Sequence, residues 1–421
     1  MRTPQNFDTL TRPQLRIATA GSVDDGKSTL IGRLLHDSKT IFEDQLDAVA
    51  KASRRYGDQE LNLALLTDGL RAEREQGITI DVAYRYFATP KRSFVLADTP
   101  GHVQYTRNMV TGASIADVAI VLVDARHGVV EQTRRHLGVS SLLGVRQLIL
   151  AVNKMDLVDW DQATFDRIVR DVESLLEELG GRTEFCALPV SALNGDNIVD
   201  CSVHASWYVG PPLLALLEDI EDHEDLPVGA RLPVQWVLRS GSDYRGYAGQ
   251  LTGGPFKVGD EIIVLPAQTR STIASLTRAG REVEYAMPGD SIAVTLTDHI
   301  DVGRGDVLVV GNASVRPVVT TTMDADLSWM IDRPLTVGDR YLVKHLARIV
   351  PAHVESILHR LNPETLVAEA ASELSINDLG RIRITFDEPI VVDPYTQNRV
   401  TGRFLLIDDR TNATAGAATV C

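Results

Sequence analysis

The 421-residue sequence is poor in cysteine and in positive charge. Its three cysteines, Cys186, Cys201 and Cys421, are odd in number and widely spaced, which argues against a disulfide framework and against a cysteine-based metal site. We therefore expect reduced thiols. Lysine and arginine total 42 against 57 acidic residues, so the formal net charge is −15. Since binding along nucleic acid requires clustered basic side chains, we expect no nucleic-acid partner.

Long apolar runs are also missing. No segment reaches the roughly 18 consecutive apolar residues of a membrane span, and the opening segment, MRTPQNFDTLTRPQ, contains no apolar stretch of signal-peptide length. We expect a cytoplasmic protein that does not associate with membranes. The hydrophobic content of 44% is ample for packed cores. A length of 421 residues suggests about three domains at roughly 150 residues each.

A glycine-rich phosphate loop stands near the start of the chain. Residues 21–28 read GSVDDGKS, which matches G-x-x-x-x-G-K-[ST] and lies between a strand-like run, Leu15–Ala20, and a helix-forming run, Ser28–Leu35. The two glycines let successive N–H groups face phosphate oxygens, and Lys27 is expected to reach the β- and γ-phosphates. Ser28 is placed to give its hydroxyl to Mg²⁺. The predicted nucleotide contacts in this segment are Gly21, Ser22, Val23, Asp24, Asp25, Gly26, Lys27, Ser28 and Thr29.

A second motif, DTPGH at residues 98–102, ends the buried-strand pattern FVLA with a Pro-Gly break. Asp98 is expected to hold Mg²⁺, usually through water, while the N–H of Gly101 can sense the γ-phosphate. His102 stands where a residue that orients the attacking water would stand, so we assign the catalytic role to His102 together with Lys27. The alternative for His102 is a solvated loop histidine. The predicted nucleotide contacts here are Asp98, Thr99, Pro100, Gly101 and His102.

A third motif, NKMD at residues 153–156, follows the strand-like run Leu148–Val152 and indicates which base is bound. Asp156 can accept hydrogen bonds from the ring N–H and the exocyclic amine of guanine. Adenine has no amine there, and discrimination built on such partners can reach about 10⁴-fold. Asn153 would bond the other edge of the base, and the stem of Lys154 could lie over its face. The predicted base contacts are Asn153, Lys154, Met155 and Asp156, with a later turn, Ser191, Ala192 and Leu193, that could offer a backbone N–H to the guanine oxygen.

A long polar stretch, RRYGDQELNLALLTDGLRAEREQGITID, separates the first two motifs. A compact domain rarely keeps so long a connection without a task. We interpret it as a switch segment whose Thr79 would complete the Mg²⁺ shell when GTP is bound. The predicted metal ligands are therefore Ser28, Thr79 and Asp98, although Thr79 could also be an ordinary residue at the start of a strand.

The pattern of strand-like and helix-like runs along the chain predicts three domains. Strand-like runs alternate with helical patterns over residues 1–228, which predicts an α/β P-loop GTPase domain with a mostly parallel sheet and with the motifs at the carboxyl ends of its strands. After the acidic linker EDHEDLPVGARLP, short β-rich runs such as KVGDEIIVLP predict a closed β-barrel over residues 229–315. A second β-barrel is expected over residues 316–421, with Lys344 and His345 on a solvated face.

Together these motifs resemble the translational GTPase superfamily, whose elongation factors show a similar phosphate loop, an EREQGITI-like segment, a DTPGH and an NKMD. The resemblance covers essentially the whole chain and implies two β-barrel domains of translation-factor type. Four segments, GSVDDGKSTLIGRLLHDS, TDGLRAEREQGITIDVAYRYF, DTPGHVQYTRNMVTGAS and DARHGVVEQTRRH, are similar to the large, GTP-hydrolysing subunit of bacterial sulfate adenylyltransferase. The phosphate loop departs from the elongation-factor pattern, because Asp25 stands where those factors usually have histidine and Ser28 where they have threonine.

The resemblance implies GTP and Mg²⁺ as cofactors and a hetero-oligomer with a small, adenylyl-transferring subunit. That partner would join ATP and sulfate into adenosine 5′-phosphosulfate and pyrophosphate in sulfate assimilation. Because the phosphate–sulfate anhydride forms uphill, GTP hydrolysis by this chain could shift the balance, provided the subunits contact each other differently in the GTP and GDP states. The sequence has no SGGxDS-type pyrophosphatase loop, which is the loop expected in the partner that performs adenylyl transfer. It also has no second G-x-x-x-x-G-K-[ST], which a fused adenylylsulfate kinase domain would need.

Two other functions fit parts of the sequence. An elongation-factor-like GTPase that binds aminoacyl-tRNA is disfavoured by the acidic balance and by Asp25. A nucleotide-binding scaffold without turnover is disfavoured by His102.

Overall fold

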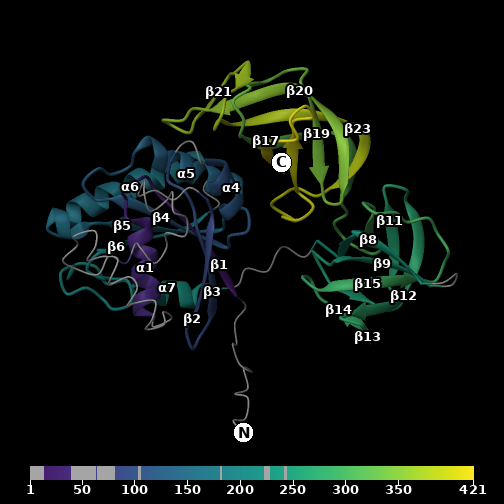
Figure 1. Ribbon diagram of the computed structural model, residues 1–421, viewed down its shortest axis with the longest axis horizontal. Coiled ribbons are helices and arrows are strands. Elements are labelled where there is room, and N and C mark those ends of the chain that lie inside the picture. Colours follow the sequence, from purple (N-terminus) through teal and green to yellow (C-terminus); the bar gives the residue numbers. More distant parts are fainter. Residues whose placement is uncertain are drawn as a thin grey trace, which may run out of the picture. The chain divides into compact units, whose positions relative to one another are not determined.

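The computed structural model describes residues 14–38, 63, 81–102, 106–180, 183–221, 228–240 and 244–421. The chain divides into two compact units, Met1–Asp222 with Leu361–Val367, and His223–Arg360 with Ala368–Cys421. The first unit holds a six-stranded sheet and the second holds two larger β-sheets (Figure 1). The expected domain boundaries at 228/229 and 315/316 stay predictions.

A mostly parallel sheet forms the centre of the first unit. Its strand order is β2-β3-β1-β4-β5-β6, and β2 runs antiparallel to β3 while the other pairs are parallel. All seven residues of β4 are buried, so both faces of the sheet are covered. The strands are β1 (Leu15–Ala20), β2 (Ala83–Ala88), β3 (Ser93–Asp98), β4 (Val118–Asp124), β5 (Gln147–Asn153) and β6 (Glu184–Pro189). The helices are α1 (Lys27–Asp37), α4 (Thr106–Ala113), α5 (Glu131–Leu142), η3 (Met155–Val158), α6 (Gln162–Glu178) and α7 (Leu213–Asp219).

Helix α6 shows how the sequence sets these elements. It begins after Asp161, whose carboxylate accepts a hydrogen bond from the N–H of Thr164 at 2.9 Å and so caps the first turn. Apolar residues recur at helical spacing along one face and are buried against the sheet. These buried residues are Phe165, Ile168, Val172 and Leu176. The helix expected from the FDRIVRDVESLLEEL pattern is confirmed.

The first sheet of the second unit is curved and antiparallel, in the order β7-β16-β11-β12-β15-β9-β8, with β13 paired to β12. An isolated antiparallel bridge between Arg231 and Thr252 brings the path back to β7. Apart from this bridge, strand pairing among the described residues does not lead from β8 back to β7, so the sheet is a half-barrel and not the fully closed barrel expected from the sequence. The strands are β7 (Arg231–Pro233), β8 (Trp236–Ser240), β9 (Tyr244–Gln250), β11 (Glu261–Leu265), β12 (Thr269–Arg278), β13 (Arg281–Val283), β15 (Ser291–Leu296) and β16 (Val307–Val310), beside a small sheet of β10 (Phe256–Lys257) and β14 (Tyr285–Ala286).

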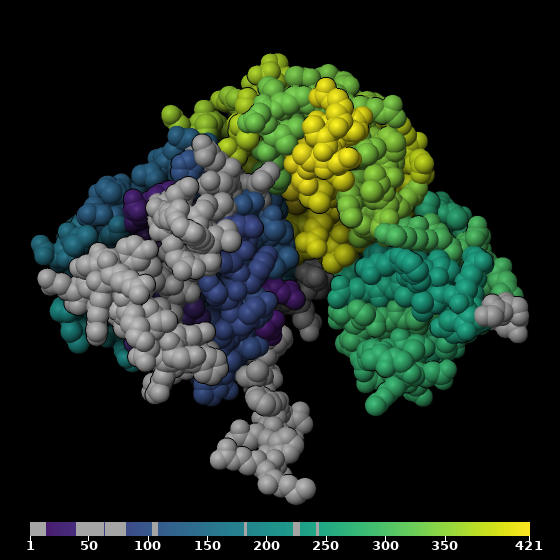
Figure 2. Space-filling view, viewed as in Figure 1, coloured from purple at the N-terminus to yellow at the C-terminus, as the bar shows by residue number. Residues whose placement is uncertain are grey.

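The last sheet closes into a six-stranded barrel. The order is β19-β24-β25-β17-β23-β20, and β19 also pairs with β20. Figure 2 shows the last residues of the sequence, in yellow, on the surface beside green residues. Strand β25 pairs with β17. The strands are β17 (Val318–Trp329), β19 (Arg340–His345), β20 (Arg348–Leu361), β23 (Leu379–Val392), β24 (Arg403–Ile407) and β25 (Thr414–Val420), with the short β18 (Leu335–Thr336), β21 (Ala368–Glu369) and β22 (Glu373–Leu374).

A buried ion pair joins the two barrel sheets of the second unit. Nη2 of Arg231 in β7 donates to Oδ1 of Asp393 at 3.2 Å, and both side chains are fully buried. The Thr401 hydroxyl donates to Asp393 at 2.6 Å. The ring Nε2 of His345 lies 2.8 Å from the carbonyl oxygen of Thr401. The expectation of a solvated face is wrong for His345, because the alternation along β19 turns it inward while Lys344 is exposed.

Helices long and apolar enough to cross a membrane do not occur in the described part of the chain. The three cysteines are free. Burial raises the pKa of the Cys186 thiol to about 11, so it packs against the apolar core as a neutral side chain.

Candidate nucleotide-binding site

The phosphate loop between β1 and α1 wraps around the ammonium group of Lys27. Its Nζ donates to the carbonyl oxygens of Gly21 and Ser22, both at 2.8 Å. Burial lowers the pKa of Lys27, against the opposite pull of nearby carboxylates. Gly26 has φ +94°, and a Cβ there would come within 2.4 Å of Nδ2 of Asn153. The loop therefore has the curved backbone typical of a phosphate loop, and position 26 requires glycine both for its φ angle and for the close approach of Asn153.

Asp25, the residue that departs from the elongation-factor pattern, points into the loop. Its side chain is buried, and Oδ2 accepts a hydrogen bond from the N–H of Ser22 at 2.6 Å. Burial raises the pKa of this carboxyl, while the Ser22 bond and the charge of Lys27 lower it. Asp25 thus braces the loop from inside, whereas its neighbours Val23 and Asp24 are exposed at the tip.

The end of β3 places Asp98 beside the phosphate loop. Thr19 of β1 pairs in register with Asp98, and its hydroxyl donates to Oδ1 of Asp98 at 3.3 Å. Gly101 packs directly on the loop, since a Cβ there would lie 2.4 Å from Nζ of Lys27 and 2.5 Å from the carbonyl oxygen of Gly21. The DTPG backbone and the phosphate loop therefore approach as closely as glycine allows.

The other residues of this motif are less exposed than a free loop would be. Thr99 and Pro100 are buried and His102 is half-buried. The hydroxyl of Thr99 donates to the carbonyl oxygen of Thr19. Ser28 lies in the first turn of α1, where its half-buried hydroxyl forms no hydrogen bond with the described residues. Thr79 lies outside the described residues, so its expected role as a metal ligand stays a prediction.

Asn153, at the end of β5, links the base-reading motif to two other segments. Its Nδ2 donates to the carbonyl oxygen of Asp25 at 2.7 Å, and its Oδ1 accepts from the N–H of Ala192 at 3.0 Å. The amide nitrogen retains a second hydrogen for a ligand. The N–H of Ala192 is therefore already used, and Leu193 is an exposed residue next to the buried Ser191 and Ala192. The expected contact between this turn and a base oxygen stays a prediction.

The residues after Asn153 form a tight turn. Lys154 has φ +61°, in the left-handed region, and the fully buried Met155 begins η3. The carboxylate of Asp156 is half-buried and forms no hydrogen bond or ion pair with the described residues. It can accept hydrogen bonds from a guanine edge without first breaking others.

Sequence reasoning missed two charged residues of this site, Asp124 and Arg126. Oδ1 of Asp124 accepts from Nε of Arg126 at 3.0 Å, and Oδ2 accepts from Nη2 at 2.7 Å and pairs with Nζ of Lys154 at 2.9 Å. Burial alone would raise the pKa of Asp124, but these bonds outweigh it and hold that pKa well below its usual range. The sequence feature that could have identified Asp124 is its place as an acidic residue at the carboxyl end of a strand, the same feature that pointed to Asp98.

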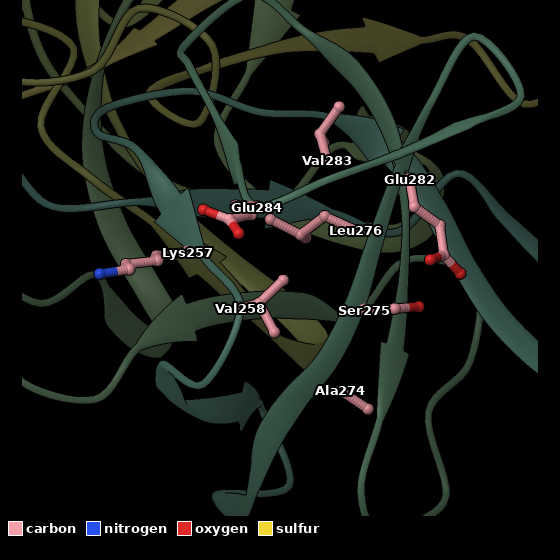
Figure 3. Close-up of a pocket in the computed structure, with 8 residues that line it drawn as sticks. All are labelled: Lys257, Val258, Ala274, Ser275, Leu276, Glu282, Val283 and Glu284. Atoms are coloured by element: carbon pink, nitrogen blue, oxygen red, sulfur yellow. The ribbon is translucent and has the colours of Figure 1, made fainter.

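A hollow of about 460 Å³ opens on the surface of the second unit. Figure 3 shows Lys257, Glu282 and Glu284 around Val258 and Leu276. Clusters of three or more histidine, cysteine or acidic side chains that could hold a metal ion do not occur among the described residues. This hollow contains none of the nucleotide motifs.

Two stretches of the chain match known protein families. Residues 12–225 match the family described as the elongation factor Tu GTP binding domain, and residues 322–421 match the family described as GTP-eEF1A C-terminal domain-like. Fold and site together define a GTPase of the translational superfamily.

Several relatives that are about half identical to this chain share one name, sulfate adenylyltransferase subunit 1. Sulfate adenylyltransferase subunit 1 of Erwinia tasmaniensis is 49% identical over 411 residues, which cover 96% of this chain and 86% of that protein. The protein of the same name from Aeromonas salmonicida is 50% identical with the same coverage, and that from Salmonella heidelberg is 48% identical over 413 residues, with coverages of 96% and 85%. The chain belongs to the sulfate adenylyltransferase subunit 1 family.

Proposed function

We propose that this chain is the GTP-hydrolysing subunit of a cytoplasmic sulfate adenylyltransferase, in which GTP hydrolysis drives formation of adenosine 5′-phosphosulfate from ATP and sulfate. A small, adenylyl-transferring partner subunit performs the synthesis. The observation that supports this function is the 49% identity to subunit 1 proteins over 96% of the chain. The elongation-factor alternative is not favoured by these relatives.

The nucleotide lies, in this proposal, at the carboxyl edge of the six-stranded sheet. Lys27 exchanges the carbonyl oxygens of Gly21 and Ser22 for phosphate oxygens, so it is held in place before the nucleotide arrives. Asp156 accepts from the two guanine N–H groups, and Asn153 aligns the base with the phosphate loop through Asp25. The site is thus preorganised for both ends of the nucleotide.

The residues expected to hold Mg²⁺ suit that ion. The hydroxyl of Ser28 and the carboxylate of Asp98 are oxygen donors, which a small hard cation prefers, and Thr79 is proposed as a third ligand. When bound, Mg²⁺ neutralises charge on the β- and γ-phosphate oxygens. Asp98 is buried beside Lys27, so its carboxylate is fixed near the phosphates.

Hydrolysis needs a water aligned with the γ-phosphate. We assign its orientation to His102, which follows the glycine that packs on the phosphate loop. Lys27 stabilises charge on the phosphate oxygens. Loss of the γ-phosphate removes the partner of the Gly101 N–H, and the segment beyond it is then free to change its contacts with the partner subunit. That difference between states is what coupling requires.

The test uses the chain copurified with its small partner subunit. GTP hydrolysis is measured for the chain alone and for the pair, adding ATP and sulfate in turn, while adenosine 5′-phosphosulfate is quantified with and without GTP. We expect hydrolysis to be stimulated by partner and substrates together, and synthesis to depend on GTP. A pair with Lys27→Ala is the matched control and should lose both. Synthesis by the wild-type pair without GTP would contradict the proposal.

A further inference from the structure

The buried carboxylate of Asp124 lies outside the three nucleotide motifs but forms bonds with a residue of one of them, Lys154. It ends β4 and receives the guanidinium of Arg126 through both oxygens. The N–H of Arg126 also donates to Oδ1 at 2.9 Å. Its second cationic partner is Lys154, the residue directly after Asn153. A carboxylate with this many donors is ionised in the folded protein and fixed in position.

Lys154 carries this connection to the phosphate loop. Its Nζ pairs with Asp124 and also donates to the carbonyl oxygen of Asp24. One ammonium group therefore ties the end of β4, the tip of the phosphate loop and the turn after β5. The side chain is 23% exposed, so a lysine without this anchor could turn its flexible stem towards solvent.

We propose that Asp124 is a positioning residue of the guanine nucleotide site, and the inference rests on the function proposed above. The charge of Asp124 holds the Lys154 ammonium against the phosphate loop, so that the lysine stem forms a fixed wall for the base. The same contact keeps the loop in register with the base-reading turn. Arg126 grips the carboxylate from its other side and keeps it pointed at Lys154.

The first variant is Asp124→Asn, which nearly keeps the shape of the side chain and removes its charge. We expect the affinities for GTP and GDP to fall together by about ten- to a hundredfold, the scale of one charged hydrogen bond. Guanine should still be preferred over adenine to the same degree, because Asp156 is unchanged. Titration with a fluorescent GDP analogue, with GTP, GDP and ATP as competitors, measures both quantities. Wild-type affinity in the variant would overturn the inference, as would a lost preference for guanine.

The second variant asks whether Asp124 acts through Lys154. Lys154→Met keeps an apolar stem and removes the ammonium group, and we expect a loss of GDP affinity similar to that of Asp124→Asn. The double variant should bind no more weakly than Lys154→Met alone, because both substitutions remove one shared interaction. Losses that add in the double variant would overturn the inference. If Asp124→Asn fails to fold by circular dichroism, Lys154→Met decides alone: lost affinity supports the proposal and wild-type affinity overturns it.

A matched control lies in the closed barrel. Asp324 accepts a two-point bond from Arg383, at 2.7 and 3.0 Å, much as Asp124 does from Arg126. Asp324→Asn makes the same chemical change in the other compact unit, in a strand that contains none of the nucleotide motifs, and should leave GDP affinity unaltered. If the wild-type chain does not bind guanine nucleotide, the proposed function fails. If it does, and Asp124→Asn binds equally well, only the positioning role fails.

Discussion

At the scale of single residues, the groups that hold the nucleotide differ from the group expected to act on water. Lys27 is buried among loop carbonyl oxygens, whereas His102 is half-buried after the glycine of the second motif. His102→Ala should therefore spare GTP binding and slow hydrolysis by about a hundredfold or more, since the water loses its orienting partner. Equilibrium binding and single-turnover hydrolysis separate the two effects. Binding and hydrolysis reduced by the same factor would instead indicate a structural role for His102.

Base recognition gives a second prediction at this scale. Asp156 presents a carboxylate free of hydrogen bonds to the described residues, so it can accept from both guanine N–H groups. Asp156→Asn replaces one acceptor oxygen with a donor, and the preference for GTP over ATP should fall by about a hundredfold or more. Competition binding with both nucleotides measures the ratio. An unchanged ratio would mean that the base is recognised by other groups.

The sequence was informative about site residues wherever a motif carries its own spacing. GSVDDGKS, DTPGH and NKMD predicted which residues would lie at the sheet edge. The bonds from Asn153 to Asp25 and Ala192 bring NKMD together with the phosphate loop and with the turn Ser191–Leu193. Asp124 was missed because the acidic end of its strand, unlike Asp98, is not followed by a motif of fixed spacing such as TPGH. That the N–H of Ala192 is already engaged depends on the Asn153 rotamer, which no pattern of residues encodes.

At the scale of elements, helix α5 carries a buried histidine beside the phosphate loop. His136 is almost fully buried, its Nε2 lies 3.2 Å from Nε2 of Gln132, and its Nδ1 has no partner among the described residues. Burial, helped by the charges of Lys27 and Arg135, lowers the pKa of His136 to about 3. The ring is therefore neutral in the folded protein over the physiological range.

This burial makes stability depend on pH. Below about 6.5 the unfolded chain binds a proton at His136 that the folded chain refuses until about pH 3, so stability falls as pH falls through this window. His136→Leu should remove about 2 kcal/mol of the stability lost between pH 7.5 and pH 5. Urea unfolding at both pH values, for variant and wild type, measures this difference. Parallel losses in the two proteins would show that His136 does not titrate in this way.

The same helix shows where element prediction from sequence fails. Strands β1, β4 and β5 are nearly continuous apolar runs, and the helix α6 has a clear apolar face, so each was predictable from pattern alone. Helix α5 buries Thr133, His136 and Ser140 along with its apolar residues, so it lacks that periodic signal. The register shifts within β17 and β20 are likewise set by pairing with β23, which is distant in sequence.

At the scale of the whole molecule, the Arg231–Asp393 pair connects the two barrel sheets. Arg231→Met would leave Asp393 buried without its cation, which costs about 3–5 kcal/mol of unfolding free energy. The double variant Arg231→Met with Asp393→Leu removes both charges and should recover much of that loss. Chemical denaturation measures these changes. A loss below about 1 kcal/mol in the single variant would show that water or another group compensates the carboxylate.

The closing strand of the last barrel has a consequence for the order in which the protein is made. β25, the seven residues Thr414–Val420, pairs with both β17 and β24. During synthesis the ribosome releases β17 long before it releases β25, and in that interval the edge of β17 that will pair with β25 is open to other nascent chains. The barrel can close only after β25 has been translated, so a transcript truncated just before Thr414 should yield an insoluble product although every nucleotide motif has already been translated.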